Sequence, residues 1–321
     1  MITALLFHES LGSSSVEEEV NPEKAIELIK SPANVWIDVV SEHKNTVEEI
    51  LNSISTEYQM LILEDMFENT KPKIELYDDS VFIVAKAYPF GSFKHCQMNM
   101  VLGKTFLLTV RDSSLNLSKV IDFMKAGKQH TCDFVLYKIL EFIYEQYYGV
   151  LESVDTKTAQ FESESLKKPT PATLTHILEM KKKLLAMHRV LISEREAALV
   201  LSRGNIGSIR QKTAIFMRDV YDDVVALIDM EENYREVLSD NIEIYMSSVN
   251  NNMNETMKTL TLIASFTFVP ALIAGLYGMN IALPFQKLEY GGIDYAFIFV
   301  TGLMIAACGY LYFILKRREC L

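Results

Sequence analysis

Two uncharged apolar runs near the carboxyl end constrain the fold of this chain more than any other feature. Residues 259–278 (TLTLIASFTFVPALIAGLYG) and 295–315 (YAFIFVTGLMIAACGYLYFIL) contain no Asp, Glu, Lys or Arg. A helix rises about 1.5 Å per residue, so each run is long enough to cross the roughly 30 Å of hydrocarbon in a bilayer. The sequence therefore predicts an integral membrane protein with two transmembrane helices.

Most of the basic residues that flank the two runs are predicted to lie on the same side of the membrane. Lys258 precedes the first run, and Lys316, Arg317 and Arg318 follow the second, whereas residues 281–294 hold a single lysine. The positive-inside rule then predicts cytoplasmic termini and an external loop. The amino terminus has no basic region before an apolar stretch, so we expect no cleaved signal. The predicted location is the cell (plasma or inner) membrane, with the lipid bilayer as a partner.

The first 207 residues have the character of a soluble domain. Runs rich in β-branched residues at 34–40 and 80–88 predict strands, and helix-like segments lie between them. From His130 the apolar spacing becomes helical, with breaks at Pro169 and Gly204. We therefore predict an α+β protein, with an α/β/α domain followed by a very long helix and a second transmembrane helix.

The long helix follows from the scarcity of helix breakers. Between Ser208 and Asn280 the only proline is Pro270, and no glycine occurs before Gly275. The predicted parts are a cytoplasmic α/β/α and helical domain (1–207), a stalk helix (208–257), a first transmembrane helix (258–280), an external loop (281–294), a second transmembrane helix (295–315) and a basic cytoplasmic tail (316–321).

Composition argues against two functional classes. The formal net charge of −11 disfavours non-specific binding to nucleic acid, which needs a basic surface. The sequence has no phosphate-binding loop and no evident pairing of a nucleophile with a base, so we expect neither an enzyme nor an organic cofactor. The four cysteines lack the spacing of a zinc site or a disulfide framework.

A helical stripe runs along the first apolar segment. It is polar at the cytoplasmic end, bulky in the middle and small toward the outside. Small residues are typical of helix–helix packing, and the same pattern fits a pore lining with a hydrophobic constriction, so the spacing leaves both interpretations open. Two spans cannot enclose a pore, so conduction requires several copies around an axis. The stripe comprises Asn254, Met257, Leu260 or Thr261, Ala264, Phe268, Ala271 and Gly275.

The stripe ends at Gly278-Met279-Asn280, and Asn280 favours the pore interpretation. A ring of neutral amides holds a bare divalent ion poorly, but it can hydrogen-bond the water shell of a hydrated one. Mg²⁺ releases its water reluctantly, so recognition through the water shell suits this ion. A glycine and an asparagine at a helix C-terminus are also ordinary caps.

The tetrapeptide YGMN at 277–280, which closes the first of two carboxy-terminal spans, resembles the CorA family of divalent-cation channels. Residues 247–280, 63–88 and 216–224 are similar to the pore, amino-domain and stalk segments of that family. The resemblance implies a homopentamer with a cytoplasmic funnel domain, a pore lined by the stalk helix and an outer ring of second spans. It also implies uptake of Mg²⁺ down its electrochemical gradient, often with Co²⁺ or Ni²⁺.

The resemblance assigns roles to individual residues. Gly278, Met279 and Asn280 match the selectivity filter, and the pore and gate positions are Asn254, Met257, Leu260, Thr261, Ala264 and Phe268. A regulatory Mg²⁺ is expected between neighbouring subunits, held by Glu64 and Asp65 on one side and by Glu243 on the other. Asp219 and Asp155 match a second ion site. Loss of the ion would leave carboxylates that repel one another and loosen the ring.

The external loop departs from the family pattern. Phe285 follows Pro284 where magnesium-transporting members have a glutamate, and the loop's only acids are Glu289 and Asp294. A ring of acids at the mouth concentrates cations, so this change bears on ion choice. One alternative is therefore a Zn²⁺ transporter of a ZntB-like branch, with proton coupling as one mode. A second alternative is a non-conducting, membrane-anchored assembly or sensor protein.

Overall fold

The computed structural model describes residues 2–8, 13–40, 44–54, 59–77, 80–89, 91–126, 131–204, 206–279, 289–290 and 293–317. The chain divides into two compact units, Met1–Glu243 and Ile244–Leu321. The sheet and the first six helices belong to the first unit, and the second contains the apolar segments.

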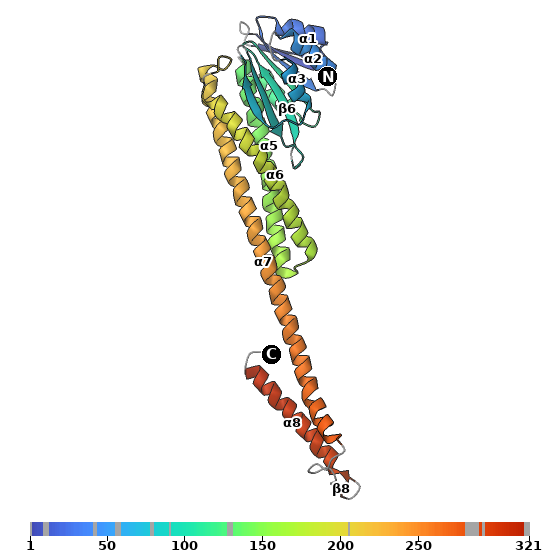
Figure 1. Ribbon diagram of the computed structural model, residues 1–321. Coiled ribbons are helices and arrows are strands. Elements are labelled where there is room, and N and C mark those ends of the chain that lie inside the picture. Colours follow the sequence, from blue (N-terminus) through green and yellow to red (C-terminus); the bar gives the residue numbers. More distant parts are fainter. Residues whose placement is uncertain are drawn as a thin grey trace. The chain divides into compact units, whose positions relative to one another are not determined.

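A mixed sheet of seven strands forms the centre of the first unit (Figure 1). The segments predicted as strands at 34–40 and 80–88 are confirmed as β3 and β5. Strands β3 and β7 run parallel, and the other neighbouring pairs described are antiparallel. The spatial order is β2 (Ser13–Glu18), β1 (Ile2–His8), β3 (Asn34–Val40), β7 (Phe106–Arg111), β6 (Cys96–Leu102), β5 (Val81–Ala87) and β4 (Lys73–Leu76).

Helices cover both faces of this sheet, because its central strands are apolar on both sides. Successive side chains of a strand point to opposite faces, and Val35 and Ile37 pack in one core while Trp36 packs in the other. Helices α1 (Pro22–Ile29), α2 (Lys44–Ser53) and α3 (Gln59–Phe67) share the first core, and α4 (Ser118–Ala126) and α5 (Cys132–Lys167) share the second. The predicted α/β/α arrangement is confirmed.

Two long helices follow the sheet. Helix α5 ends at Lys167, before Pro169, and α6 (Pro171–Ser202) begins with the Thr170 hydroxyl accepting a hydrogen bond from the Thr173 N–H. Gly204, with φ of +69°, follows the end of α6 in the left-handed conformation that glycine adopts readily.

Helix α7 (Gln211–Tyr277) is a single element of 67 residues. Its start is fixed by Asp133 of α5, whose carboxylate accepts hydrogen bonds from the backbone N–H and the guanidinium of Arg210. Burial would raise the pKa of Asp133, but hydrogen bonds from Thr131, Thr213 and Arg210 outweigh burial and lower it. This carboxylate therefore stays charged and holds the approach to α7 in place.

Polar contacts between helices hold the first part of α7 against α5 and α6. His188 Nδ1 lies 2.6 Å from Glu231 Oε2, and Lys181 Nζ donates to Ser239 Oγ at 2.8 Å. The Asn241 amide donates to the Thr158 carbonyl of α5 at 3.1 Å. These contacts extend as far as Asn241, so the stretch of α7 that precedes Glu243 belongs to the packed unit.

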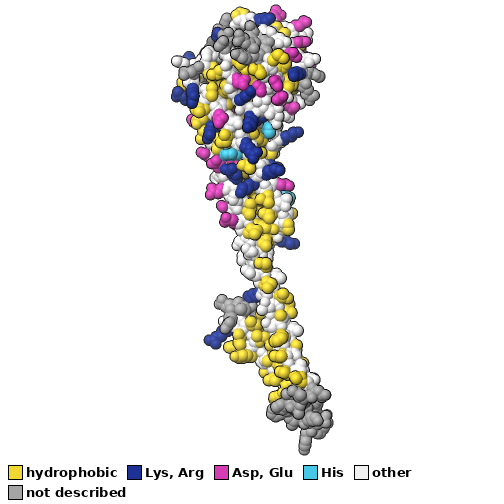
Figure 2. Space-filling model, viewed as in Figure 1, with side chains coloured by type: hydrophobic (Ala, Val, Ile, Leu, Met, Phe, Trp, Pro, Cys, Tyr) yellow, Lys and Arg dark blue, Asp and Glu magenta, His cyan; other side chains and the backbone are white. Residues whose placement is uncertain are grey.

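The second unit contains the remainder of α7, the two-residue strands β8 (Glu289–Tyr290) and β9 (Ile293–Asp294), and α8 (Tyr295–Arg317). The sequence predicted only a loop between the spans, whereas β8 and β9 pair within it. Helices α7 and α8 each contain an apolar stretch long enough to cross a membrane, with mean hydropathies of 1.9 and 2.1. Figure 2 shows apolar side chains gathered along this unit, where neither stretch is buried within the chain.

A buried carboxyl group joins α6 to the sheet. Glu194 accepts a hydrogen bond from the backbone N–H of Lys86 at 2.7 Å and another from the Tyr144 hydroxyl at 2.9 Å. The Tyr147 hydroxyl donates to the Lys86 carbonyl at 2.7 Å. Burial raises the pKa of Glu194 to about 8, against the opposing effects of the two hydrogen bonds and the Lys86 charge.

This raised pKa predicts that stability depends on pH. The folded state holds the Glu194 proton more tightly than the unfolded chain, whose ordinary value is 4.5, so stability is lost as pH rises from 4.5 to about 8. The loss relative to Glu194→Gln is at most about 1.4 kcal/mol per pH unit. We expect thermal unfolding, followed by circular dichroism, to show that the stability of the variant relative to the native protein increases as the pH rises across this range. Exposed Glu196→Gln on the same helix is the control, and a pH-independent difference for Glu194→Gln would contradict the assignment.

Candidate ion pathway and regulatory carboxylates

The predicted amino-domain acids lie on α3 in different environments. The Glu64 side chain is exposed and makes no hydrogen bond or ion pair with the residues that the structure describes. Asp65 Oδ2 accepts from Lys73 Nζ at 2.5 Å, and its backbone carbonyl accepts from the Gln97 amide at 2.8 Å. Asp65 is therefore held against β4 and β6, whereas the Glu64 side chain is exposed to solvent.

Lys73 is a participant that sequence reasoning missed. Its ammonium also lies 2.8 Å from Glu75 Oε1. Burial works to lower the pKa of Lys73, but the hydrogen bonds and charges of Asp65 and Glu75 outweigh burial and raise it. A cation arriving at Asp65 must therefore compete with a lysine that stays protonated. The available signal was the position of Lys73 eight residues after Asp65, in a segment that the sequence analysis did not assign to a strand.

The remaining predicted regulatory acids lie on the long helices. Glu243 and Asp219 are on α7, and Asp155 is on α5. All three side chains are exposed, and within the described part of the chain they make no hydrogen bond or ion pair. Each carboxylate is therefore accessible to a cation or to another chain, and no described basic side chain forms an ion pair with it.

Asp219 has acidic neighbours that the sequence analysis did not single out. The pKa of Asp223 is raised, first by burial and then by the negative charges of Glu141, Asp219 and Asp222. Glu141 of α5 is itself bound by Lys138 and by the Tyr137 hydroxyl, each at 2.6 Å. The pair Asp222-Asp223 was visible in residues 216–224, but the approach of Glu141 depends on the packing of α5 against α7.

One chain does not assemble a metal site from these acids. Among the residues that the structure describes, no group of three or more His, Cys, Asp or Glu side chains is placed to hold a metal ion. The predicted ligands Glu64, Asp65, Glu243, Asp219 and Asp155 are therefore not brought together within the chain.

The predicted pore and gate residues all lie on α7 and are all exposed. Met257 is 56% exposed, Leu260 59% and Phe268 65%, which is unusual for large apolar side chains unless another surface covers them. The Thr261 hydroxyl donates to the Met257 carbonyl at 2.8 Å, so its hydrogen-bond donor has a partner within the helix. Asn254 and Ala264 complete the exposed set.

Gly278 and Met279, the first two residues of the predicted filter, directly follow the end of α7. The helix ends at Tyr277, the Gly278 N–H donates to the Ala274 carbonyl at 2.8 Å, and the Met279 N–H donates to the Leu276 carbonyl at 3.3 Å. A Cβ at Gly278 would lie 3.1 Å from the Ala274 oxygen, a tight contact that favours glycine. Met279 is 47% exposed. Asn280 lies outside the described residues, and only the backbones of the loop acids Glu289 and Asp294 are described, in β8 and β9.

Proteins of known sequence or structure resemble this chain over most of its length. Residues 32–317 match the family described as CorA-like Mg²⁺ transporter protein. The cobalt/magnesium transport protein CorA of Thermotoga maritima is 26% identical over 309 residues, which cover 92% of this chain and 86% of that protein. The complete structure of the CorA magnesium transporter from Methanocaldococcus jannaschii superposes with a TM-score of 0.80 at 24% identity, covering 99% of this chain and 98% of the other.

A more distant likeness concerns the soluble part. The cytoplasmic domain of ZntB from Vibrio parahaemolyticus matches 78% of this chain and 98% of its own length, with a TM-score of 0.62 at 11% identity, which is a likeness of fold. With the family match extending over both apolar helices, the chain belongs to the CorA-like Mg²⁺ transporter family. It is a divalent-cation transporter of two candidate membrane spans.

Proposed function

We propose that this chain forms a homopentameric channel in the cell membrane that carries hydrated Mg²⁺ into the cytoplasm, with Co²⁺ and Ni²⁺ as further substrates. The observation that carries the proposal is the exposed apolar and amide stripe of α7, which ends at Gly278 and Met279. Five such helices around an axis cover the side chains that one chain leaves exposed. A membrane potential of 100 mV supplies about 4.6 kcal/mol per divalent ion, so no ATP is needed.

The stripe supplies both a gate and a filter in this proposal. Met257, Leu260 and Phe268 form apolar rings that exclude water when the helices approach one another. Gly278, Met279 and Asn280 form the outer filter, where the amides hydrogen-bond the water shell of the ion. Glu289 and Asp294 in the external loop attract cations to the mouth.

We further propose that cytoplasmic Mg²⁺ closes the channel by bridging subunits. Glu64 and Asp65 of one copy face Glu243 of the next, and Asp219 and Asp155 contribute a second site. The salt bridge between Lys73 and Asp65 affects ion binding at this sensor, because the lysine is paired with the carboxylate when the ion is absent. When the ion binds, Asp65 gives up its contact with Lys73 of the same chain. It gains instead a bridge through the ion to Glu243 of the neighbouring chain.

Uptake into proteoliposomes that contain the purified full chain tests the transport proposal. Mg²⁺, Co²⁺ and Zn²⁺ are compared at a fixed potential, with and without a pH gradient, and with Mg²⁺ loaded inside or omitted. We expect Mg²⁺ entry driven by voltage alone and suppressed by internal Mg²⁺.

Two outcomes of that assay would replace the proposal. Zn²⁺ entry that requires a pH gradient would place the protein in the zinc branch, which the fold likeness to ZntB and Phe285 in the external loop favour. Absence of flux for all three ions would favour a membrane-anchored assembly or sensor protein.

A further inference from the structure

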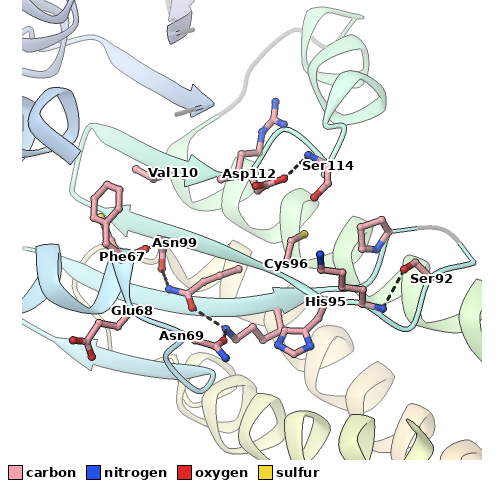
Figure 3. Close-up of a pocket in the computed structure, with 16 residues that line it drawn as sticks. Phe67, Glu68, Asn69, Ser92, His95, Cys96, Asn99, Val110, Asp112 and Ser114 are labelled. Atoms are coloured by element: carbon pink, nitrogen blue, oxygen red, sulfur yellow. Dashed lines mark hydrogen bonds between the residues drawn. The ribbon is translucent and has the colours of Figure 1, made fainter. Parts of the chain in front are cut away.

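A cavity of about 800 Å³ lies in the first unit beside the ends of β5, β6 and β7 (Figure 3). This volume falls within the range of small-molecule binding sites. Its wall combines polar groups with apolar ones from four segments of the chain, and it includes none of the proposed filter, gate or sensor acids. The residues that matter most are Phe67, Asn69, Lys86, Pro89, Lys94 and His95.

Lys86 supplies a buried positive charge to this cavity. The residue is 3% exposed, and its Nζ donates to Asn69 Oδ1 at 2.7 Å and to Gln97 Oε1 at 2.8 Å. Both acceptors are neutral amides, and no carboxylate of the described residues lies within ion-pair distance of this ammonium. Burial lowers the pKa of Lys86, and the negative charge of Glu194 opposes this effect only in part. An ammonium has three N–H donors, so one remains available.

The polar groups around Lys86 are mostly committed to each other. The Gln97 oxygen also accepts from the Thr70 N–H, and the Gln97 nitrogen donates to the Asp65 carbonyl and to Asn99 Oδ1. The Asn69 oxygen accepts from Lys86, which leaves its amide nitrogen as a donor. Beside Lys86 the cavity therefore offers hydrogen-bond donors, and the amide oxygens of Asn69, Gln97 and Asn99 already accept hydrogen bonds.

The other charges that line the cavity are balanced or lie at its surface. Arg111 is neutralised by Asp38, at 2.8 Å between Nη2 and Oδ2. Glu68, Lys94 and Asp112 are exposed, and the Asp112 carboxylate accepts a hydrogen bond from the Ser114 N–H at 2.7 Å. Figure 3 shows Asn69 and His95 on one side of the cavity and Asp112 and Ser114 on the other. Lys86 is thus the one buried charge of the lining without a carboxylate partner among the described residues.

We propose that this cavity binds a small phosphate-bearing molecule, whose phosphate oxygens accept hydrogen bonds from Lys86 Nζ and the Asn69 amide. A phosphate offers several charged acceptors to these convergent donors, and the exposed ammonium of Lys94 supplies a second positive charge. The cavity is larger than a phosphate ion, and Phe67 and Pro89 give the remainder of the ligand an apolar wall. The occupant is therefore expected to be about the size of a nucleotide.

Isothermal titration calorimetry on the full chain in detergent tests this site, with adenosine monophosphate as the probe and neither Mg²⁺ nor phosphate in the buffer. Asn69→Asp keeps the oxygen that accepts from Lys86 but places a carboxylate beside the ammonium, so it neutralises the site with little change in shape. We expect saturable binding by the native chain and a loss of at least about tenfold in affinity for Asn69→Asp. The control Asn233→Asp makes the same charge change at an exposed position of α7 and is expected to bind as the native chain does.

Two further arms fix the interpretation. Inorganic phosphate is expected to compete with the nucleotide, and Lys86→Met is expected to weaken binding at least as much as Asn69→Asp, with folding checked by circular dichroism. No saturable binding by the native chain, or equal affinities for Asn69→Asp and Asn233→Asp, would overturn the proposal. The assay measures no ion flux, so its result is independent of the transport proposal.

Discussion

Replacement of Asn280 by alanine is expected to reduce voltage-driven Mg²⁺ uptake into proteoliposomes by at least about tenfold, which corresponds to about 1.4 kcal/mol. In the proposed pentamer the change removes a ring of five amides at once. A methyl group cannot hydrogen-bond the water shell of the ion, and Mg²⁺ does not shed that shell easily. The measurement is the initial rate of Mg²⁺ entry at fixed potential, reported by an indicator dye inside the vesicles.

Asn252→Ala is the matched control for this prediction. Asn252 is an exposed amide on α7, outside the stripe that contains Asn254 and Met257. We expect its uptake to remain near that of the native chain. Equal uptake by Asn280→Ala and the native chain would remove Asn280 from the filter. If both also equalled empty vesicles, the non-conducting alternative would gain support.

Replacement of Glu243 by alanine is expected to raise the internal Mg²⁺ concentration that half-closes the channel by about tenfold. The variant removes one exposed carboxylate per subunit, five in the proposed ring, and thereby weakens the attraction for a bridging divalent ion. The measurement is Mg²⁺ uptake as a function of Mg²⁺ loaded inside the vesicles. Uptake at low internal Mg²⁺ is expected to match that of the native chain.

Three companion variants separate charge from shape at this position. Glu243→Gln keeps the length of the side chain and is expected to behave like Glu243→Ala, whereas Glu243→Asp keeps the charge and is expected to preserve closure. Glu236→Ala removes another exposed carboxylate from the same helix and serves as the control. Identical inhibition curves for Glu243→Ala and Glu236→Ala would rule out Glu243 as a ligand of the sensor.

The strands and the long helices could be predicted because their causes are local. The alternating and β-branched residues at 34–40 favour an extended strand, and the segment forms β3, which is buried between two apolar layers. The proline at 169 and the glycine at 204 separate α5, α6 and α7 whatever the rest of the chain does. The small ladder of β8 and β9 was missed, since two-residue strands carry too little pattern to recognise.

The candidate site was predictable only in part. Gly278 and the exposed stripe could be found because their positions follow from one helix and its end. The partners of the sensor acids could not be predicted, since Lys73 reaches Asp65 through the placement of β4 beside α3. Likewise, Glu141 of α5 acts on Asp223, the neighbour of Asp219, only because α5 packs against α7. Which acids meet across subunits depends on a second copy and stays a prediction.

The sequence by itself determined two membrane-length apolar segments and the helix of 67 residues that contains the first of them, because hydropathy and helix breaking act over a few neighbouring residues. Only the tertiary structure decided which polar groups lost contact with water. Glu194 and Lys86 look like ordinary surface residues in the sequence, yet α6 and β5 bury both. Their altered pKa values arise because removal from water disfavours a charge, and that removal depends on segments 108 residues apart in the chain.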